Sequence, residues 1–396
     1  MSAAQIVGGV GVAVGLALSS VVVDELSGST VISGFAGTAT VLGAALLALP
    51  AARLSSVGGR RAGLSLTYLA ALVGCAISVA AISLGNWPLL LAGLVLVGGG
   101  SAGSLAARYS ATDLSPPGHS ARHLSLIVWA STIGSVAGPN LAEPADKIGI
   151  QAGLAAKAGP FAFAALAFAL ALAVVIGGLR PDPLKLAREL DGVKETGTGR
   201  HRTIRTGLRT LRDTPMARRA LVMIAVAHTA MVSIMSMTPV KLHHDGSDLN
   251  VIGLVISLHI AGMYMFSPIV GWLADKAGKV PVLLLGSALL LASAVLAATA
   301  GHRVWQVTTA LVVLGLGWSC GLVAGSALVT ESVPIDRRPA VQGLSDLLMN
   351  VCGASGTIVA GAIVGVVSYG ALGLVVGIMV TAAGLWLATA RHREAT

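Results

Sequence analysis

Residues 281–300 read PVLLLGSALLLASAVLAATA, a run of twenty residues without a charged side chain. As an α-helix such a run crosses about 30 Å of hydrocarbon, whereas the strands of a membrane barrel would alternate polar and apolar residues. Similar runs recur along all 396 residues, of which 55% are hydrophobic and 11% are charged, and the mean hydropathy is +0.84. Because a soluble protein carries about 25% charged residues, the composition excludes a soluble protein and predicts an all-α membrane protein.

Hydropathy predicts twelve spanning helices, six on each side of a polar segment. The predicted spans are residues 5–25, 31–50, 63–85, 88–107, 121–142, 154–179, 220–240, 251–272, 281–300, 305–329, 340–364 and 369–390. With a cytoplasmic N-terminus, all but four of the 26 Lys and Arg residues lie on the cytoplasmic side. Cytoplasmic loops carry this excess of basic residues, so both termini are expected in the cytoplasm.

The polar segment 181–218 separates two predicted six-helix bundles, residues 1–180 and 219–396. Its apolar residues Ile204, Leu208 and Leu211 share one helix face and are surrounded by Arg200, Arg202, Arg205, Arg209 and Arg212. This pattern predicts either an amphipathic helix on the anionic cytoplasmic leaflet or a solvated tether. The net charge of +9 is assigned to this membrane surface, and no nucleic-acid partner is expected.

The two bundles repeat one another in sequence. Gly59-Arg60 recurs as Gly278-Lys279 at an offset of 219 residues, and Asp113-x-x-Pro116 recurs as Glu331-x-x-Pro334 at an offset of 218. Parallel halves of this kind are an architecture of secondary transporters, in which the substrate site lies near the middle of the membrane.

Residues 271–279, GWLADKAGK, follow the eighth predicted span. They resemble the signature of the major facilitator superfamily, which lies between the second and third helices of each half. Residues 52–61 form a degenerate first copy, with Ser56 where the family has Asp. The chain therefore resembles twelve-helix drug:proton antiporters of that superfamily, of the actinobacterial exporter type. The resemblance implies a cytoplasmic gate formed by Gly271, Asp275, Lys276, Gly278, Lys279, Arg60, Arg61, Asp113, Glu331 and Arg338.

The charges of this gate suggest their own partners. We expect Lys279 to pair with Glu331 and Arg60 to pair with Asp113. Asp275 is expected to face the N-terminal end of the eleventh helix, where the helix dipole favours an anion. Such contacts would favour the outward-open state and break on inward opening; the alternative is a static turn.

The fifth predicted span carries Gly134, Gly138 and Pro139, which resemble part of the antiporter signature of proton-coupled exporters. Small residues also allow close helix packing, and packing alone is the alternative. Many drug:proton antiporters carry an arginine in the fourth helix, where this chain has Leu94. Proton coupling through that arginine is therefore not expected.

Ionisable residues inside a membrane are costly, so each is a candidate functional residue. Asp346, with Asn350 one turn later, is the leading candidate for proton coupling; a hydrogen bond to the backbone or to Arg338 is the alternative. Four further candidates for proton coupling are His259, His228, Asp24 and Glu25. The alternative is that the two histidines are ordinary core residues and that the two acidic residues form a solvated cap.

Flexible thioethers suit a cavity that accepts varied apolar shapes, although helix packing also explains them. The predicted substrate cavity is lined by Asn350, Met231, Met235, Met263, Tyr264 and Trp129. The segment His243-His244-Asp245 supplies too few positioned ligands for a metal site, and no cofactor is expected. The sequence lacks a phosphate-binding G-x-x-x-x-G-K-[ST] motif, so ATP is not expected as the energy source.

These features together predict a proton-coupled exporter of small apolar or amphipathic compounds, and no enzyme. It is expected to act as a monomer in a bacterial plasma membrane. The alternatives are an importer or metabolite exporter of the same fold and, in another class, a membrane receptor or scaffold without transport.

Overall fold

The computed structural model describes residues 1–116, 118–192, 203–247 and 249–394, and these residues form helices and connecting turns without a β-strand. The helices that precede the central linker are α1 (Ser2–Ala17), α2 (Ser19–Ser27), α3 (Thr30–Ser33), α4 (Phe35–Gly58), α5 (Arg60–Ser83), α6 (Trp87–Ser110), α7 (Ser120–Gln151) and α8 (Gly159–Gly178). The linker holds α9 (Pro183–Leu190) and α10 (Thr203–Asp213). The remaining helices are α11 (Pro215–His244), α12 (Leu249–Tyr264), α13 (Ser267–Ala277), α14 (Lys279–Thr299), α15 (Val304–Ser332), α16 (Arg338–Val366) and α17 (Tyr369–Glu394).

The predicted twelve spans are confirmed. Eleven helical segments of the described chain are long and apolar enough to cross a membrane, and a bent pair within α7 makes twelve when it is counted as one span. The two parts of α7, Ser120–Gly138 and Asn140–Gln151, meet at an angle of 53°. A proline in a helix interior lacks the N–H that the preceding turn needs, which accounts for the bend at residue 139.

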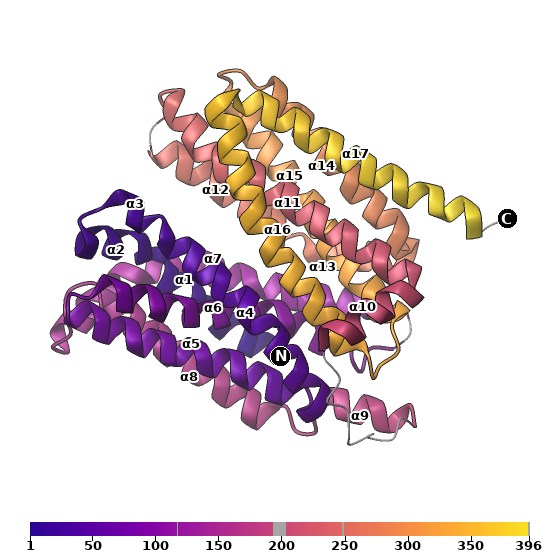
Figure 1. The fold of residues 1–396 in the computed structure, drawn as a ribbon, viewed down its shortest axis with the longest axis horizontal. Coiled ribbons are helices and arrows are strands. Elements are labelled where there is room, and N and C mark those ends of the chain that lie inside the picture. The colour runs from indigo at the N-terminus through magenta and orange to yellow at the C-terminus, as the bar shows by residue number, and fades with distance from the viewer. Residues whose placement is uncertain (117, 193–202, 248, 395–396) are drawn as a thin grey trace. The chain divides into compact units, whose positions relative to one another are not determined.

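The chain forms two compact units. Unit 1 comprises Met1–Leu114, Ala130–Thr210 and Pro334–Asn350, and unit 2 comprises Ser115–Trp129, Leu211–Val333 and Val351–Thr396. In unit 1, α5 lies beside α6 and α8, and α4 packs on α6 (Figure 1). In unit 2, α15 packs on α11, α12 and α14, and α14 also packs on α17. Both α7 and α16 divide between the units, so each of these helices belongs to both.

Glycines allow the closest helix approaches. A Cβ added at Gly98 of α6 would lie 2.2 Å from the carbonyl oxygen of Thr40 in α4. Inside a bilayer the hydrophobic effect does not drive helices together, so membrane helices associate through such close packing. The α4–α6 contact therefore depends on the absence of a side chain at this position.

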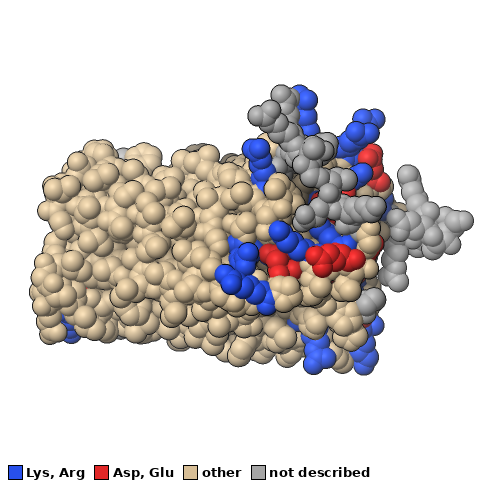
Figure 2. Space-filling view, turned by 90° about the horizontal axis from the view of Figure 1, so that it is seen from below, with Lys and Arg blue, Asp and Glu red and all other residues tan. Residues whose placement is uncertain are grey.

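Charged residues are unevenly distributed over the surface. On the face shown in Figure 2, Lys, Arg, Asp and Glu side chains gather in one region, beside a broad area of uncharged residues. An uncharged band next to a charged margin is what a bilayer-spanning protein requires.

Candidate functional site

A buried ion pair in unit 1 joins α6 to α16. The Arg108 Nη2 donates to Asp346 Oδ1 at 2.8 Å, and the two side chains are only 2% and 5% exposed. The guanidinium also donates to Tyr109 Oη at 3.1 Å and lies 4.6 Å from the centre of that ring. Two charges removed from water are tolerated only when they are paired in good geometry, so this pair is the strongest candidate for a functional site.

The partner of Asp346 was not foreseen from the sequence. The fourth predicted span, 88–107, ends just before Arg108, which put this residue in the following cytoplasmic loop, whereas it lies in the last turn of α6 and is buried. The two residues are 238 positions apart, so local patterns carried no signal of their contact. Asn350, the predicted neighbour, donates to the backbone carbonyl of Asp346 at 2.8 Å.

A second buried ion pair lies in the same unit, and it was predicted. Arg60 Nε donates to Asp113 Oδ2 at 2.7 Å, and its Nη2 donates to Asp113 Oδ1 at 2.9 Å. The same Nη2 donates to Gln342 Oε1 at 2.7 Å. Gln342 lies one helical turn before Asp346 on α16. Two cations and two anions are therefore held around the first part of α16.

The motif of unit 2 forms its predicted charge pair. Lys279 Nζ lies 2.9 Å from Glu331 and 3.2 Å from Asp275. The turn requires Gly278, whose φ of +96° is rarely adopted by residues with a side chain. Gly271 allows close approach, since a Cβ there would lie 2.2 Å from the Ser125 hydroxyl.

The prediction for Asp275 was wrong in its partner helix. Its carboxylate accepts hydrogen bonds from the backbone N–H groups of Ala121 at 3.2 Å and Arg122 at 2.8 Å. These groups begin α7, the fifth span, and not the eleventh. The chemistry is as expected, because a carboxylate is stabilised at a helix N-terminus. The choice of helix depends on tertiary packing, which places residues 115–129 in unit 2.

Three other gate residues and Ser56 have varied surroundings. Lys276 Nζ lies 4.8 Å from the centre of the Trp272 ring. The backbone N–H of Arg61 donates to Asp182 at 2.8 Å, and Arg338 begins α16. Ser56, at the position of the missing carboxylate, donates to the backbone carbonyl of Arg53.

The antiporter-type motif lies against α1. A Cβ added at Gly134 would lie 2.6 Å from the backbone of Gly9, and one added at Gly138 would lie 2.1 Å from the Cβ of Ala13. Both glycines thus allow α7 to approach α1 closely, and a further role of this motif in antiport stays a prediction. The side chain of Pro139 lies outside the described residues.

Two histidines of unit 2 have defined partners. His259 is fully buried, its Nδ1 lies 2.7 Å from the carbonyl oxygen of Leu311, and its Nε2 has no hydrogen-bond partner among the residues that the structure describes. Trp318 Nε1 donates to Nδ1 of His228 at 3.2 Å. Tyr264 packs edge-on against Trp318 with a centroid distance of 5.7 Å. His228, Tyr264 and Trp318 thus form an aromatic cluster from α11, α12 and α15.

The structure brings together only part of the predicted cavity. Met231 and Met263 are buried in unit 2, and Met235 is half-buried. Trp129 is 41% exposed. Asp24 and Glu25 lie in α2, where Glu25 forms an ion pair with Lys157. The Glu25 side chain is 54% exposed in this pair, and its role in proton coupling stays a prediction.

A small polar cluster of unit 2 lies around the C-terminal end of α11, where Asp245 follows the last turn. Asp245 accepts hydrogen bonds from Lys241 Nζ at 2.6 Å and His302 Nδ1 at 2.8 Å. Burial raises the pKa of Asp245, but its hydrogen bonds with Lys241 and His302 outweigh burial, so its pKa lies below the ordinary value. Within the described chain, no group of three or more His, Cys, Asp or Glu residues is arranged to hold a metal ion.

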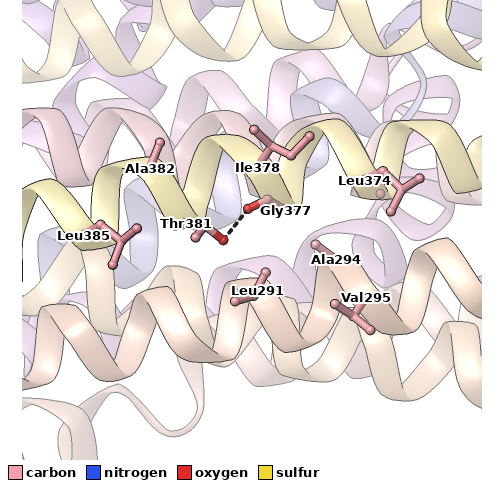
Figure 3. Close-up of a pocket in the computed structure, with 10 residues that line it drawn as sticks. Leu291, Ala294, Val295, Leu374, Gly377, Ile378, Thr381, Ala382 and Leu385 are labelled. Atoms are coloured by element: carbon pink, nitrogen blue, oxygen red, sulfur yellow. Dashed lines mark hydrogen bonds between the residues drawn. The ribbon is translucent and has the colours of Figure 1, made fainter.

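An apolar groove of about 460 Å³ lies between α14 and α17 (Figure 3). Its lining includes Leu291, Val295, Leu374 and Ile378. The only hydroxyl among its lining residues, on Thr381, donates to the carbonyl of Gly377 at 2.8 Å. The residues that line this groove carry no charge.

The helix predicted in the linker is present as α10, while Arg200 and Arg202 lie outside the described residues. Ile204 and Leu208 are exposed, whereas Leu211 is buried. The opposite face is close to α16, because a Cβ added at Gly207 would lie 3.1 Å from the Ala340 carbonyl.

Known proteins resemble this chain in sequence and in fold. The family model described as Major Facilitator Superfamily matches residues 1–249 and 222–396. The uncharacterized MFS-type transporter YdeG of Bacillus subtilis (strain 168) is 35% identical over 381 residues, covering 96% of this chain and 88% of YdeG. The riboflavin transporter RfnT of Brucella anthropi is 28% identical over 315 residues, covering 78% of this chain and 74% of RfnT.

Solved structures share the fold at low identity. The human organic anion transporter MFSD10 has a TM-score of 0.78 and 15% identity, with coverage of 98% of this chain and 97% of that chain. The E. coli fucose:proton symporter FucP (N162A) has a TM-score of 0.71 and 14% identity, with coverage of 98% of each chain.

Proposed function

Because the chain belongs to the major facilitator superfamily, whose members are transporters and not enzymes, we propose that it is a proton-coupled exporter of small apolar or amphipathic compounds. The Arg108–Asp346 ion pair is the observation that supports this proposal. Asp346 would be the coupling carboxylate, and Arg108 would be its counter-ion.

The coupling follows from charge balance. In the ionised pair the two charges neutralise each other, which is the state favoured in a low dielectric. A proton on Asp346 removes its negative charge. The guanidinium of Arg108 is then stabilised only by its other contacts, which include the hydroxyl and the ring of Tyr109. The free energy of the contact between α6 and α16 then depends on the proton, so the proton gradient can drive a change between two conformations.

The gate contacts supply the other half of such a cycle. Arg60–Asp113, Lys279–Glu331 and Asp275 with the α7 N-terminus are all formed in this structure. Under the proposal these contacts hold the cytoplasmic side closed and break when it opens. The breakable ion pairs also favour transport over a receptor or scaffold, since a static protein gains little from them.

Substrate class and direction are the finer part of the proposal. The buried thioethers of Met231 and Met263 and the scarcity of charges in unit 2 favour apolar or amphipathic compounds. Export is favoured by the antiporter-type residues Gly134 and Gly138, although both also serve helix packing.

A second candidate function has its own observation. The aromatic cluster of His228, Tyr264 and Trp318 suits a planar heteroaromatic ring, because aromatic rings associate edge-to-face or offset-stacked. One relative is named a riboflavin transporter, and a solved structure of the same fold is a fucose:proton symporter. A proton-coupled importer or metabolite transporter is therefore the alternative.

The proposal is tested in liposomes with an imposed pH gradient. Purified protein is screened against a panel that includes ethidium, an apolar dye, riboflavin and fucose. We expect proton-driven transport of an amphipathic compound, abolished by Asp346→Asn and retained by Glu143→Gln, which removes an exposed carboxylate. Equal transport by Asp346→Asn and the unaltered protein would remove Asp346 from the mechanism. Transport of riboflavin or fucose alone would favour the alternative.

The proposed setting is a bacterial plasma membrane, with both termini cytoplasmic and the protein acting as a monomer. The linker helix α10 is joined to the spanning helix α11 by Thr214 alone, so it lies close to the membrane surface. Its exposed Arg205, Arg209 and Arg212 stand beside exposed Ile204 and Leu208. Exposed cations beside apolar residues suit anionic lipid headgroups.

A further inference from the structure

The linker helix α9 is attached to unit 1 by a carboxylate shared between two helix N-termini. Asp182, the residue before α9, accepts hydrogen bonds from Leu184 N–H at 3.1 Å and Lys185 N–H at 3.3 Å. The same carboxylate accepts from Arg60 N–H at 3.1 Å and Arg61 N–H at 2.8 Å. It therefore caps both α9 and α5, and each cap satisfies N–H groups that have no partner within their own helix.

Two more contacts hold α9 in place. Arg188 is buried, and its Nη1 donates to the carbonyl oxygen of Ser56 at 2.8 Å, near the C-terminal end of α4. A cation is favoured at that end of a helix. On the apolar side, Leu184 and Ala187 form a buried cluster with Ile335, which precedes α16. One helix of eight residues thus connects α4, α5 and the segment that leads into α16.

The α4–α5 turn is shaped to receive this carboxylate. Gly59 has a φ of +83°, and a Cβ added there would lie 2.5 Å from the carboxylate of Asp182. A side chain at this position would therefore push Asp182 away from the backbone N–H groups of Arg60 and Arg61.

The corresponding turn of unit 2 has its own acid. Asp275 lies within the motif and accepts from two N–H groups at the start of α7. The first copy of the motif has Ser56 in that position, and Ser56 uses its hydroxyl locally on Arg53. In unit 1, the linker rather than the motif provides a carboxylate that binds two N–H groups at the start of a spanning helix.

We propose that α9, through Asp182 and Arg188, is a cytoplasmic latch that compensates for the acid missing at Ser56 and detaches each time the cytoplasmic side opens. The reason lies in what α9 joins. By sequence, Ile335 belongs to the second six-helix half, whereas α4 and α5 belong to the first. Separation of the two halves at this side must break the contacts of α9 with one of them.

The simplest competing explanation is a permanent anchor of the linker. An anchor and a latch share the same contacts but differ in their response to a distant change. Loosening the contact of Asp275 with α7 should release α9 if it is a latch, and should leave it in place if it is an anchor.

Thiol labelling distinguishes the two in purified protein in detergent micelles. Cysteine is introduced by Ala187→Cys, a position 5% exposed on the buried face of α9, and its reaction with a polar maleimide is timed. Protein without the added cysteine is the blank for Cys75, Cys320 and Cys352. Leu190→Cys, at a position 74% exposed, reports the rate for a free thiol.

We expect Asp182→Asn to accelerate labelling of the introduced thiol about tenfold or more, because charge-assisted hydrogen bonds are lost. Glu189→Gln removes an exposed carboxylate of the same helix and should change the rate by less than about twofold. Asp275→Asn, whose hydrogen bonds and ion pair given above are with Ala121, Arg122 and Lys279, should also accelerate labelling about threefold or more by favouring the open state.

Each outcome decides the proposal. Acceleration by both Asp182→Asn and Asp275→Asn supports a latch. An unchanged rate in Asp275→Asn shows a fixed anchor and overturns the proposal, and so does an unchanged rate in Asp182→Asn. If Asp182→Asn does not fold, Arg188→Gln replaces it, and the Asp275→Asn measurement stands independently. Neither measurement requires a substrate or proton coupling, so the proposed function can fail without affecting this result.

Discussion

Neutralising Asp346 should destabilise the protein far more than removing the whole Arg108–Asp346 pair. At 2.8 Å the two charges attract each other by about 6 kcal/mol at an effective dielectric constant of 20. Desolvation of each ion costs several kcal/mol, so the intact pair contributes little net stability. Asp346→Asn removes the attraction but leaves the guanidinium of Arg108 buried, which costs about 3–5 kcal/mol in comparable cases.

The double variant Asp346→Asn with Arg108→Met removes both charges. Its unfolding free energy should therefore lie within about 2 kcal/mol of the unaltered protein, less destabilised than either single variant. Reversible unfolding in mixed micelles, followed by tryptophan fluorescence during titration with sodium dodecyl sulfate, measures all four corners of this cycle. Because Arg108→Met likewise leaves a buried charge and should cost about as much as Asp346→Asn, the coupling is expected to be about 4 kcal/mol or more.

A matched control is available on the surface. Glu143 and Lys147 form an ion pair at 2.7 Å with side chains 78% and 70% exposed. Solvent screens such a pair, so the same cycle with Glu143→Gln and Lys147→Met should show no measurable coupling. The reasoning is refuted if the Asp346 and Arg108 variants are additive, or if Asp346→Asn alone costs less than about 1 kcal/mol.

Three further predictions concern packing, pH and lipid. Gly138→Leu should destabilise the protein by about 1–3 kcal/mol through overlap with Ala13, whereas Gly365→Leu, with open space around it, should not; thermal unfolding measures both. Asp245→Asn should lower the free energy of unfolding by about 1 kcal/mol at pH 7. The pKa of Asp245 is depressed in the folded protein, so its carboxylate adds stability at a pH above its ordinary pKa of about 3.9. The difference between the variant and the unaltered protein should vanish as the pH falls through the pKa of the folded state. Equal destabilisation at pH 3 and pH 7 would contradict this assignment. Replacing the exposed Arg205, Arg209 and Arg212 of α10 by glutamine should lower the retention of phosphatidylglycerol several-fold in native mass spectrometry. Retention of phosphatidylcholine, which carries no net charge, should stay the same.

The parts of the site that the sequence predicted depend on repeats and local spacing. The pairs Arg60–Asp113 and Lys279–Glu331 follow from two copies of one motif, so each copy supports the other. The spanning helices follow from hydropathy, because the bilayer imposes length and composition directly. These signals require no knowledge of how distant helices pack.

The parts that were missed depend on tertiary contacts. Arg108 seemed to be a loop residue because hydropathy cannot distinguish a buried, paired arginine from a solvated one at the end of a span. Asp182 lies in a polar linker whose composition suggested only a tether or a surface helix, yet it is buried against α5. Asp275 was assigned to a suitable kind of partner, a helix N-terminus, but to the wrong helix.

The neutrality of Gln342 determines how the buried charges of unit 1 respond to a proton. Arg60 and Arg108 face Asp113 and Asp346, and Gln342, which accepts a hydrogen bond from Arg60, carries no charge. Gln342→Glu in the unaltered protein adds an anion without a cation to balance it, which should cost about 1–3 kcal/mol. In Asp346→Asn, where one cation is in excess, the same substitution should instead recover about 1–2 kcal/mol of unfolding free energy. This change of sign, measured by the same micelle titration, would arise only if the network behaves as one charge-balanced group. The same sign in both backgrounds would show that the two ion pairs are independent, and protonation of Asp346 would then be a local event confined to Arg108.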